Sequence, residues 1–170
     1  MFYRAAREYD GTYWSGRELP YERAGSMAFA IKAEIRDSRA KRFVFDAQKT
    51  MYGGKNIAEG DAIFLFASEN DGGQGLVARG IVIAAEAIAK KPGIARQTPR
   101  VSVTVKRTAL AVRSLGRGEL KPFTQWNDGR PETELNFKFY RQATNKIVGL
   151  SDATAKFLDG FTPKVPVAQD

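Results

Sequence analysis

The sequence predicts a mixed α+β fold of five or six strands and two or three short helices, in which two of the strands need cover on both faces, as in a small closed barrel. Two neighbouring segments carry this prediction. Residues 62–67, which follow a Gly-Asp turn, and residues 75–83 are apolar at almost every position. A strand that is apolar on both faces must be covered on both sides, as in a small closed barrel. The Asn-Asp-Gly-Gly turn at 70–73 folds the two segments into a hairpin.

Other strands are predicted where apolar and polar residues alternate, because a half-buried strand has a period of two. The alternating segments are residues 29–35, 101–105 and 135–139. Residues 42–45 continue the first of these or pair with it. Residues 81–89 are too uniformly apolar for periodicity to separate strand from helix, but their β-branched start favours a strand over 76–86.

The helical signals are short. Residues 46–59, around a Gly-Gly pair, fit a short helix or a loop better than a strand. Ser151 is a good N-cap for a helix over 153–158, and Gly160 ends that helix. We interpret residues 1–25 as an irregular arm and residues 162–170 as a loose tail. With no repeat and no linker, we expect a single domain over the whole chain of 170 residues.

The chain contains neither cysteine nor histidine. Disulfides, thiol nucleophiles, Ser-His-Asp triads and histidine-based zinc sites are therefore excluded. We expect no catalytic residue, no metal and no cofactor. The first residues lack the apolar core of a secretory signal, and no apolar run approaches the length that spans a bilayer. We therefore expect a cytoplasmic protein with no membrane partner.

The net charge of +8 is concentrated in one stretch of the chain. Residues 90–121 carry nine basic side chains and a single acidic one, Glu119. Positive charge gathered in this way is typical of a protein with a polyanionic partner. The alternative is a solvated basic face that only aids solubility.

The order of these elements resembles the PUA-like superfamily, and within it most resembles the EVE domain, with ASCH and YTH domains as near relatives. The resemblance lies in the hairpin of residues 64–70 and 75–83 and in the later run of residues 141–151. It implies a small distorted barrel with outer helices, an aromatic-lined pocket for a modified base, and nucleic-acid binding. One departure is that EVE sequences usually open with tryptophan and then Lys-x-x-Pro, whereas Trp14 here precedes Ser-Gly-Arg-Glu-Leu-Pro.

A site that reads a base needs flat apolar surfaces, polar atoms for the base edge and cations for the phosphates. The candidates for holding the base are Trp14, Tyr52, Phe66, Ser68, Glu69, Asn70 and Trp126. The candidates for phosphate contacts are Lys49, Lys55, Arg96, Arg100, Lys106 and Arg141. Core packing is the competing role for Phe66, and turn chemistry is the competing role for Ser68 and Asn70.

The sequence therefore predicts a non-catalytic nucleic-acid-binding module that accommodates a modified or flipped base. DNA is favoured over RNA, because EVE-like domains resemble modules found with DNA modification systems. One alternative is an ASCH-like nuclease or small hydrolase that works without metal or histidine, with Lys49, Tyr52, Lys55 and Glu69 as acid and base groups. The other is a protein-interaction domain whose basic face meets an acidic partner.

Overall fold

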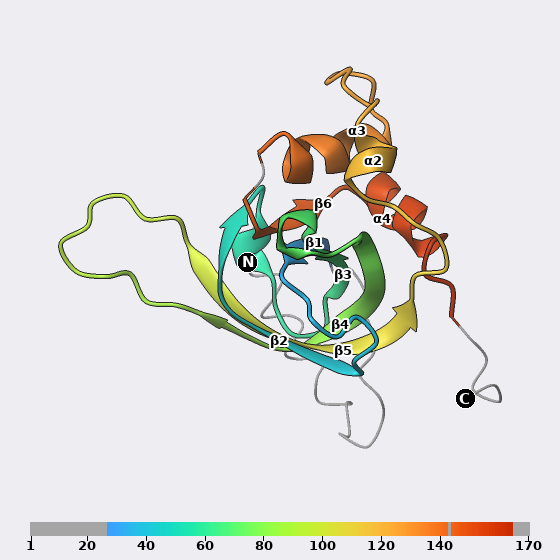
Figure 1. The fold of residues 1–170 in the computed structure, drawn as a ribbon. Helices are drawn as coiled ribbons and strands as arrows, with labels where there is room; N and C mark the ends of the chain where they lie inside the picture. The colour runs from blue at the N-terminus through green and yellow to red at the C-terminus, as the bar shows by residue number, and fades with distance from the viewer. Residues whose placement is uncertain (1–26, 143, 165–170) are drawn as a thin grey trace.

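A computed structural model describes residues 27–142 and 144–164 of the chain. Six strands close into a barrel in the order β1-β3-β4-β5-β2-β6 (Figure 1). The strands are β1 (Ala28–Ala33), β2 (Arg42–Met51), β3 (Ala62–Ala67), β4 (Gly75–Ala87), β5 (Arg100–Leu110) and β6 (Lys146–Leu150). The predicted α+β barrel is therefore confirmed. The predicted arm over residues 1–25 lies outside the described residues.

The apolar residues of strand β3 explain why helices must cover the outside of the barrel. All six of its residues are buried. Ile63 and Leu65 point into the barrel core, together with Phe29 and Val105 among others. The alternate residues of β3 face the opposite way, into a second apolar cluster between the barrel and the helices. That cluster includes Phe64, Phe66, Leu120, Leu135, Phe139 and Leu158. The doubly apolar strand is thus covered on both sides, as its sequence predicts.

Short helices form the outer layer on one side of the barrel (Figure 1). They are α2 (Arg117–Leu120), α3 (Pro131–Leu135), the π-helix η4 (Asn136–Tyr140) and α4 (Asp152–Asp159). The predicted cap of the last helix is present, because the backbone N–H of Thr154 donates to the hydroxyl of Ser151 at 3.2 Å. Gly160 follows the helix, also as predicted. Among the described residues, no helix has the length and apolar content needed to cross a bilayer.

The predicted strand over 135–139 is wrong, because these residues are helical. Pro131 opens α3 at its first turn, and the chain continues without a break from α3 into η4. The buried side chains are those of Leu135, Asn136 and Phe139, which share one helical face. Phe137 lies off that face and is only partly buried, so the apparent alternation comes from aromatic residues with two different environments.

The strand that completes the barrel was not predicted. It is β6, which pairs antiparallel with β1 and parallel with the end of β2. The segment 46–59 is divided between the end of β2, which reaches Met51, and a short 3-10 helix, η2 (Gly54–Asn56). The prediction of a short helix or loop holds only for the second half of that segment. Of the predicted tail, residues 162–164 are described, and Thr162 is buried.

Candidate functional site

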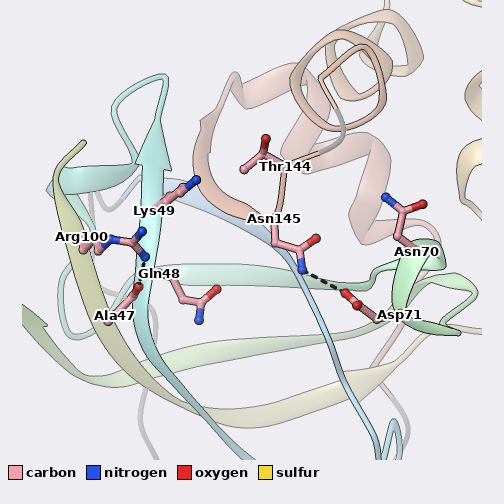
Figure 2. Close-up of a pocket in the computed structure, with 8 residues that line it drawn as sticks. All are labelled: Ala47, Gln48, Lys49, Asn70, Asp71, Arg100, Thr144 and Asn145. Atoms are coloured by element: carbon pink, nitrogen blue, oxygen red, sulfur yellow. Dashed lines mark hydrogen bonds between the residues drawn. The ribbon is translucent and has the colours of Figure 1, made fainter. Parts of the chain in front are cut away.

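A polar hollow of about 380 Å³ opens at one end of the barrel (Figure 2). Four separate segments of the chain build it: the second half of β2, the start of β5, the turn after β3, and the loop before β6. Its lining residues are Ala47, Gln48, Lys49, Asn70, Asp71, Arg100, Thr144 and Asn145. None of these eight side chains is aromatic, so this hollow is not the aromatic-lined pocket that the resemblance implies.

One wall of the hollow is shaped by a β-bulge in β2. The register between β2 and β5 shifts between Phe45 and Gln48, and Ala47 there has φ of 48°, which few residues other than glycine adopt. Two contacts hold this backbone. The N–H of Ala47 donates to the hydroxyl of Ser102 at 2.8 Å, and Arg100 donates to the carbonyl of Ala47 at 2.7 Å. The bulge therefore fixes the position of Lys49 and Arg100 on one side of the hollow.

The opposite wall follows the end of β3, where the chain turns through the 3-10 helix η3 (Glu69–Asp71). The amide nitrogen of Asn145 donates to Asp71 Oδ2 at 3.1 Å, and this bond joins two lining segments (Figure 2). Arg117 from α2 donates to Asn70 Oδ1 at 2.9 Å, which leaves the amide N–H groups of Asn70 as donors. This wall thus offers one carboxylate and two carboxamides.

The arrangement separates two kinds of chemistry. The β2–β5 wall carries exposed cations, which suit a phosphate or another anion. The wall after β3 carries hydrogen-bond donors and acceptors, which suit the edge of a planar polar group. The hollow is also in the size range of small-ligand sites. Among the described residues, no three acidic side chains gather to hold a metal ion.

Charged side chains are also buried beneath η4. Lys32 of β1 and Lys146 of β6 are opposite each other in the sheet, and both are fully buried. Lys32 donates to the carbonyl of Phe139 at 2.8 Å, and Lys146 donates to the carbonyls of Gln142 and Thr144 at 3.1 and 3.0 Å. Burial lowers the pKa of Lys32, and it lowers the pKa of Lys146 to about 8 with help from the nearby charge of Lys32.

Glu69 lies in the same region and is bonded from two sides. The Tyr140 hydroxyl donates to its two carboxylate oxygens at 3.1 and 3.2 Å, and the backbone N–H of Arg117 donates to Oε2 at 2.8 Å. Burial raises the pKa of Tyr140, and the negative charge of Glu69 raises it further. Tyr140 therefore stays protonated and acts as a hydrogen-bond donor that fixes the turn after β3.

The buried lysines predict an unusual rise of stability with pH. The unfolded chain keeps a lysine proton up to pH about 10.4, whereas folded Lys146 loses it near pH 8. Between these values the unfolded state binds more protons, so the free energy of unfolding rises with pH, by about 1–2 kcal/mol from pH 7.5 to 9.5. Urea unfolding at both pH values measures the rise, which Lys146→Met should diminish. An equal rise in wild type and variant would contradict the assignment to Lys146.

Of the residues predicted to form the site, the structure brings three to the hollow: Lys49, Asn70 and Arg100. Glu69 is adjacent to it but is engaged by Tyr140 and Arg117. Of the four groups considered for acid-base chemistry, Lys49 alone lines this hollow.

The remaining candidates lie elsewhere. Phe66 is fully buried and packs against Phe139 at 5.1 Å between ring centroids. Tyr52 is half-exposed, and the ammonium group of Lys138 lies 5.1 Å from its ring centroid. Trp126 is 77% exposed in the loop between α2 and α3. Trp14 lies outside the described residues.

Ser68 and the remaining basic candidates also lie away from the lining of the hollow. Ser68 is buried, and its hydroxyl has no hydrogen-bond partner among the described residues. Lys55 is exposed on η2, and Lys106 is exposed on β5. Arg96 is exposed in the loop between β4 and β5. The guanidinium group of Arg141 lies 4.7 Å from the ring centroid of Phe137.

Sequence reasoning did not assign a site role to five of the lining residues: Ala47, Gln48, Asp71, Thr144 and Asn145. Asp71 belongs to the strong turn signal at 70–73, which by itself explains an aspartate there. Thr144 and Asn145 precede a strand that was not predicted. Their place at the hollow depends on the pairing of β6 with β1. These two strands are far apart in the sequence, so no local pattern indicates the pairing.

No protein-family model matches the sequence, and no curated protein matches it either. Solved structures do match. Human THYN1, crystallised in complex with DNA containing 5-methylcytosine, has a TM-score of 0.55 and 18% identity over 83% of this chain and 100% of that one. A Pseudomonas putida protein has a TM-score of 0.54 and 15% identity over 79% of this chain and 98% of that one.

The DUF55 domain of human thymocyte nuclear protein 1 is a further match, with a TM-score of 0.52 and 15% identity over 77% of this chain and 95% of the other. These identities are low, but the alignments extend over nearly the full length of each matched structure. The TM-scores of 0.52 to 0.55 indicate a shared overall fold along that length. The chain therefore shares the fold of human THYN1 and of the DUF55 domain of thymocyte nuclear protein 1.

Proposed function

We propose that this chain is a non-catalytic nucleic-acid-binding module that holds a modified or flipped base of DNA in the hollow beside Asn70 and Asp71. The observation that carries the proposal is the division of the hollow into a cationic wall and a wall of amide and carboxylate groups. A structure of the same fold, human THYN1, is in complex with DNA containing 5-methylcytosine, which supports both the ligand class and the choice of DNA.

The amide and carboxylate wall suits a base with an exocyclic amine. Asp71 offers a carboxylate acceptor, and such an acceptor pairs with the amino group of cytosine. The free N–H groups of Asn70 can donate to ring nitrogen or carbonyl acceptors on the same edge. A base in a duplex exposes this edge only after it leaves the stack, so the proposal requires a flipped or unpaired nucleotide.

The cationic wall supplies the backbone contacts. Lys49 is exposed at the rim, where it can meet the phosphates that flank the extruded nucleotide. Because the hollow has no aromatic lining, the base would stack on a guanidinium plane rather than on a ring. Arg100 is placed for this role by its bond to the Ala47 carbonyl.

The test is a titration of the purified protein with fluorescent duplexes that carry one central cytosine, 5-methylcytosine or N6-methyladenine, at about 50 mM salt. We expect Lys49→Ala and Asp71→Ala each to weaken binding of the preferred duplex about tenfold, which corresponds to one good polar contact. Lys156→Ala removes an exposed lysine on α4, away from the hollow, and should change the affinity less than twofold.

The two walls should respond differently. Lys49→Ala should weaken all duplexes alike and reduce the dependence of affinity on salt. Asp71→Ala should reduce the preference for one base more than it reduces the overall affinity. Failure of the wild type to bind any duplex or single strand would overturn the proposal, and equal affinity for every base would reduce it to a backbone binder.

A further inference from the structure

A long loop extends from the barrel between β4 and β5, and Figure 1 shows it projecting away from the other elements. We call residues 88–99 the basic arm. It carries Lys90, Lys91 and Arg96, all exposed, and it has no acidic residue. Two exposed apolar side chains accompany them: Ile88 at the base and Ile94 in the middle, 41% and 51% exposed.

The tip of the basic arm is held in shape by one side chain. The amide group of Gln97 accepts from the N–H of Lys91 at 3.0 Å and donates to the carbonyl of Lys91 at 2.8 Å. It also donates to the carbonyl of Ile94 at 3.2 Å. Gly93, with φ of 83°, supplies the left-handed turn that this closure needs. The tip is therefore a small closed loop that presents Ile94 at its end.

The base of the arm adjoins the hollow. The N–H of Ile88 donates to the carbonyl of Arg100 at 2.9 Å, and Arg100 lines the hollow. From Arg100 to Ile94 is six residues, a reach of at most about 20 Å when fully extended. A B-DNA groove is about 6–12 Å wide and 7.5–8.5 Å deep, so an arm of this length can enter a groove while the hollow holds a nucleotide nearby.

We infer that the basic arm inserts into a groove of duplex DNA beside the nucleotide held in the hollow, with Ile94 wedged against a neighbouring base step. This inference rests on the proposed function and adds to it that the partner is a duplex. Proteins that deform DNA commonly insert isoleucine or another apolar side chain between base steps, and flanking cations hold the two backbones. Here Lys90 and Lys91 precede Ile94 and Arg96 follows it.

The composition of the arm favours this partner over an acidic protein. A lone exposed isoleucine is ordinary on a protein surface. This one differs in its setting, since it lies at the end of an arm whose charges all have one sign and whose tip is closed by Gln97. A phosphate backbone on each side of a groove matches cations placed on both limbs of the arm. An acidic protein that binds the arm instead is one outcome of the test below.

The test uses the full chain and a duplex with a single 5-methylcytosine and 2-aminopurine two steps away, so that its emission reports unstacking beside the held base. We expect saturating wild-type protein to raise the emission at least threefold. Ile94→Ser should remove at least half of this rise and weaken binding less than fivefold, while Ile94→Phe should retain the rise. Val112→Ser is the matched control, because Val112 is a 60% exposed apolar residue outside the arm.

The results separate the two proposals. If the wild type prefers 5-methylcytosine but Ile94→Ser raises the emission as much as wild type does, the inference about the arm is wrong and the proposed function stands. The same holds if Lys90→Glu with Arg96→Glu leaves duplex affinity unchanged or abolishes only the binding of an acidic polypeptide such as polyglutamate. If the wild type binds no duplex or single strand at 50 mM salt, both proposals fail.

Discussion

Replacement of Glu134 by alanine is expected to lower the free energy of unfolding by about 3 kcal/mol, although this side chain touches neither the hollow nor the barrel interior. Glu134 lies on α3, and its carboxylate collects hydrogen bonds from two other helices. Lys138 of η4 donates to Oε2 at 2.8 Å, as does the backbone N–H of Ser151 at 3.0 Å. The hydroxyls of Ser151 and Thr154 donate to Oε1, each at 2.6 Å.

The size of the effect follows from what alanine would leave behind. Burial alone would raise the pKa of Glu134, yet the hydrogen bonds from Lys138, Ser151 and Thr154 outweigh it and lower that pKa. Removal of the carboxylate would leave the hydroxyls of Ser151 and Thr154 without this acceptor in a half-buried place, and of its hydrogen bonds the Lys138 ammonium would keep only that to the carbonyl of Gly149. A lowered pKa also means that the stability from Glu134 is present at neutral pH and is lost as the pH falls through that pKa.

Urea unfolding of Glu134→Ala, Glu134→Gln and Glu132→Ala measures this contribution. Glutamine keeps one acceptor oxygen without the charge, so its cost should be about half that of alanine. Glu132→Ala removes a carboxylate from the first turn of the same helix and should cost less than about 1 kcal/mol. Equal losses for Glu134→Ala and Glu132→Ala would contradict the role given to the network.

The barrel could be predicted from local patterns because the residues of each strand in its main hairpin indicate whether that strand is buried on one face or on both. The segment 62–67 is apolar at every position, and this already requires cover on both faces. The helical nature of 131–140 could also have been found from the sequence. Pro131 with acidic residues in the following turn is a helix-start signal, and it outweighs the alternation of aromatic residues that favoured a strand.

The closure of the barrel could not be predicted in the same way. It depends on two parallel pairings, β1 with β3 and β2 with β6, between segments far apart in the sequence. The candidate site shares this dependence, since Asn145 meets Asp71 only when β6 lies beside β1. Residue type and turn position were enough to propose Lys49, Asn70 and Arg100 as site residues. They were not enough to predict the burial of Lys32 and Lys146, because a lysine in a sequence normally indicates an exposed position.

The seam between β2 and β6 is where the fold and the candidate site depend on the same residues. Only Thr50–Ile147 and Met51–Val148 pair there. The backbone then continues the contact, because the N–H of Gly149 donates to the carbonyl of Tyr52 at 3.0 Å. Two glycines allow this approach. A Cβ on Gly54 would lie 2.2 Å from the carbonyl oxygen of Ile147, and a Cβ on Gly149 would lie 2.6 Å from that of Tyr52.

Gly54→Ala should therefore lower the free energy of unfolding by about 3 kcal/mol. The new methyl group would overlap backbone atoms of β6, which cannot move away as a flexible side chain could. Gly118→Ala is the matched control: nothing lies within 4 Å of a Cβ there, and alanine favours the helix in which Gly118 is found. Urea unfolding should show a loss for the first variant and no change or a small gain for the second. Equal stability of the two variants would contradict the close packing of the seam.

The same substitution should weaken DNA binding even at temperatures where Gly54→Ala stays folded. The seam holds β2, which carries Lys49, against β6, which follows directly after Asn145. A carbonyl displaced by a methyl group moves these two walls of the hollow apart. Loss of affinity in folded Gly54→Ala, measured with the duplex that wild type prefers, would tie the hollow to the closure of the barrel. Unchanged affinity would place the DNA contact outside the hollow, on the basic arm alone.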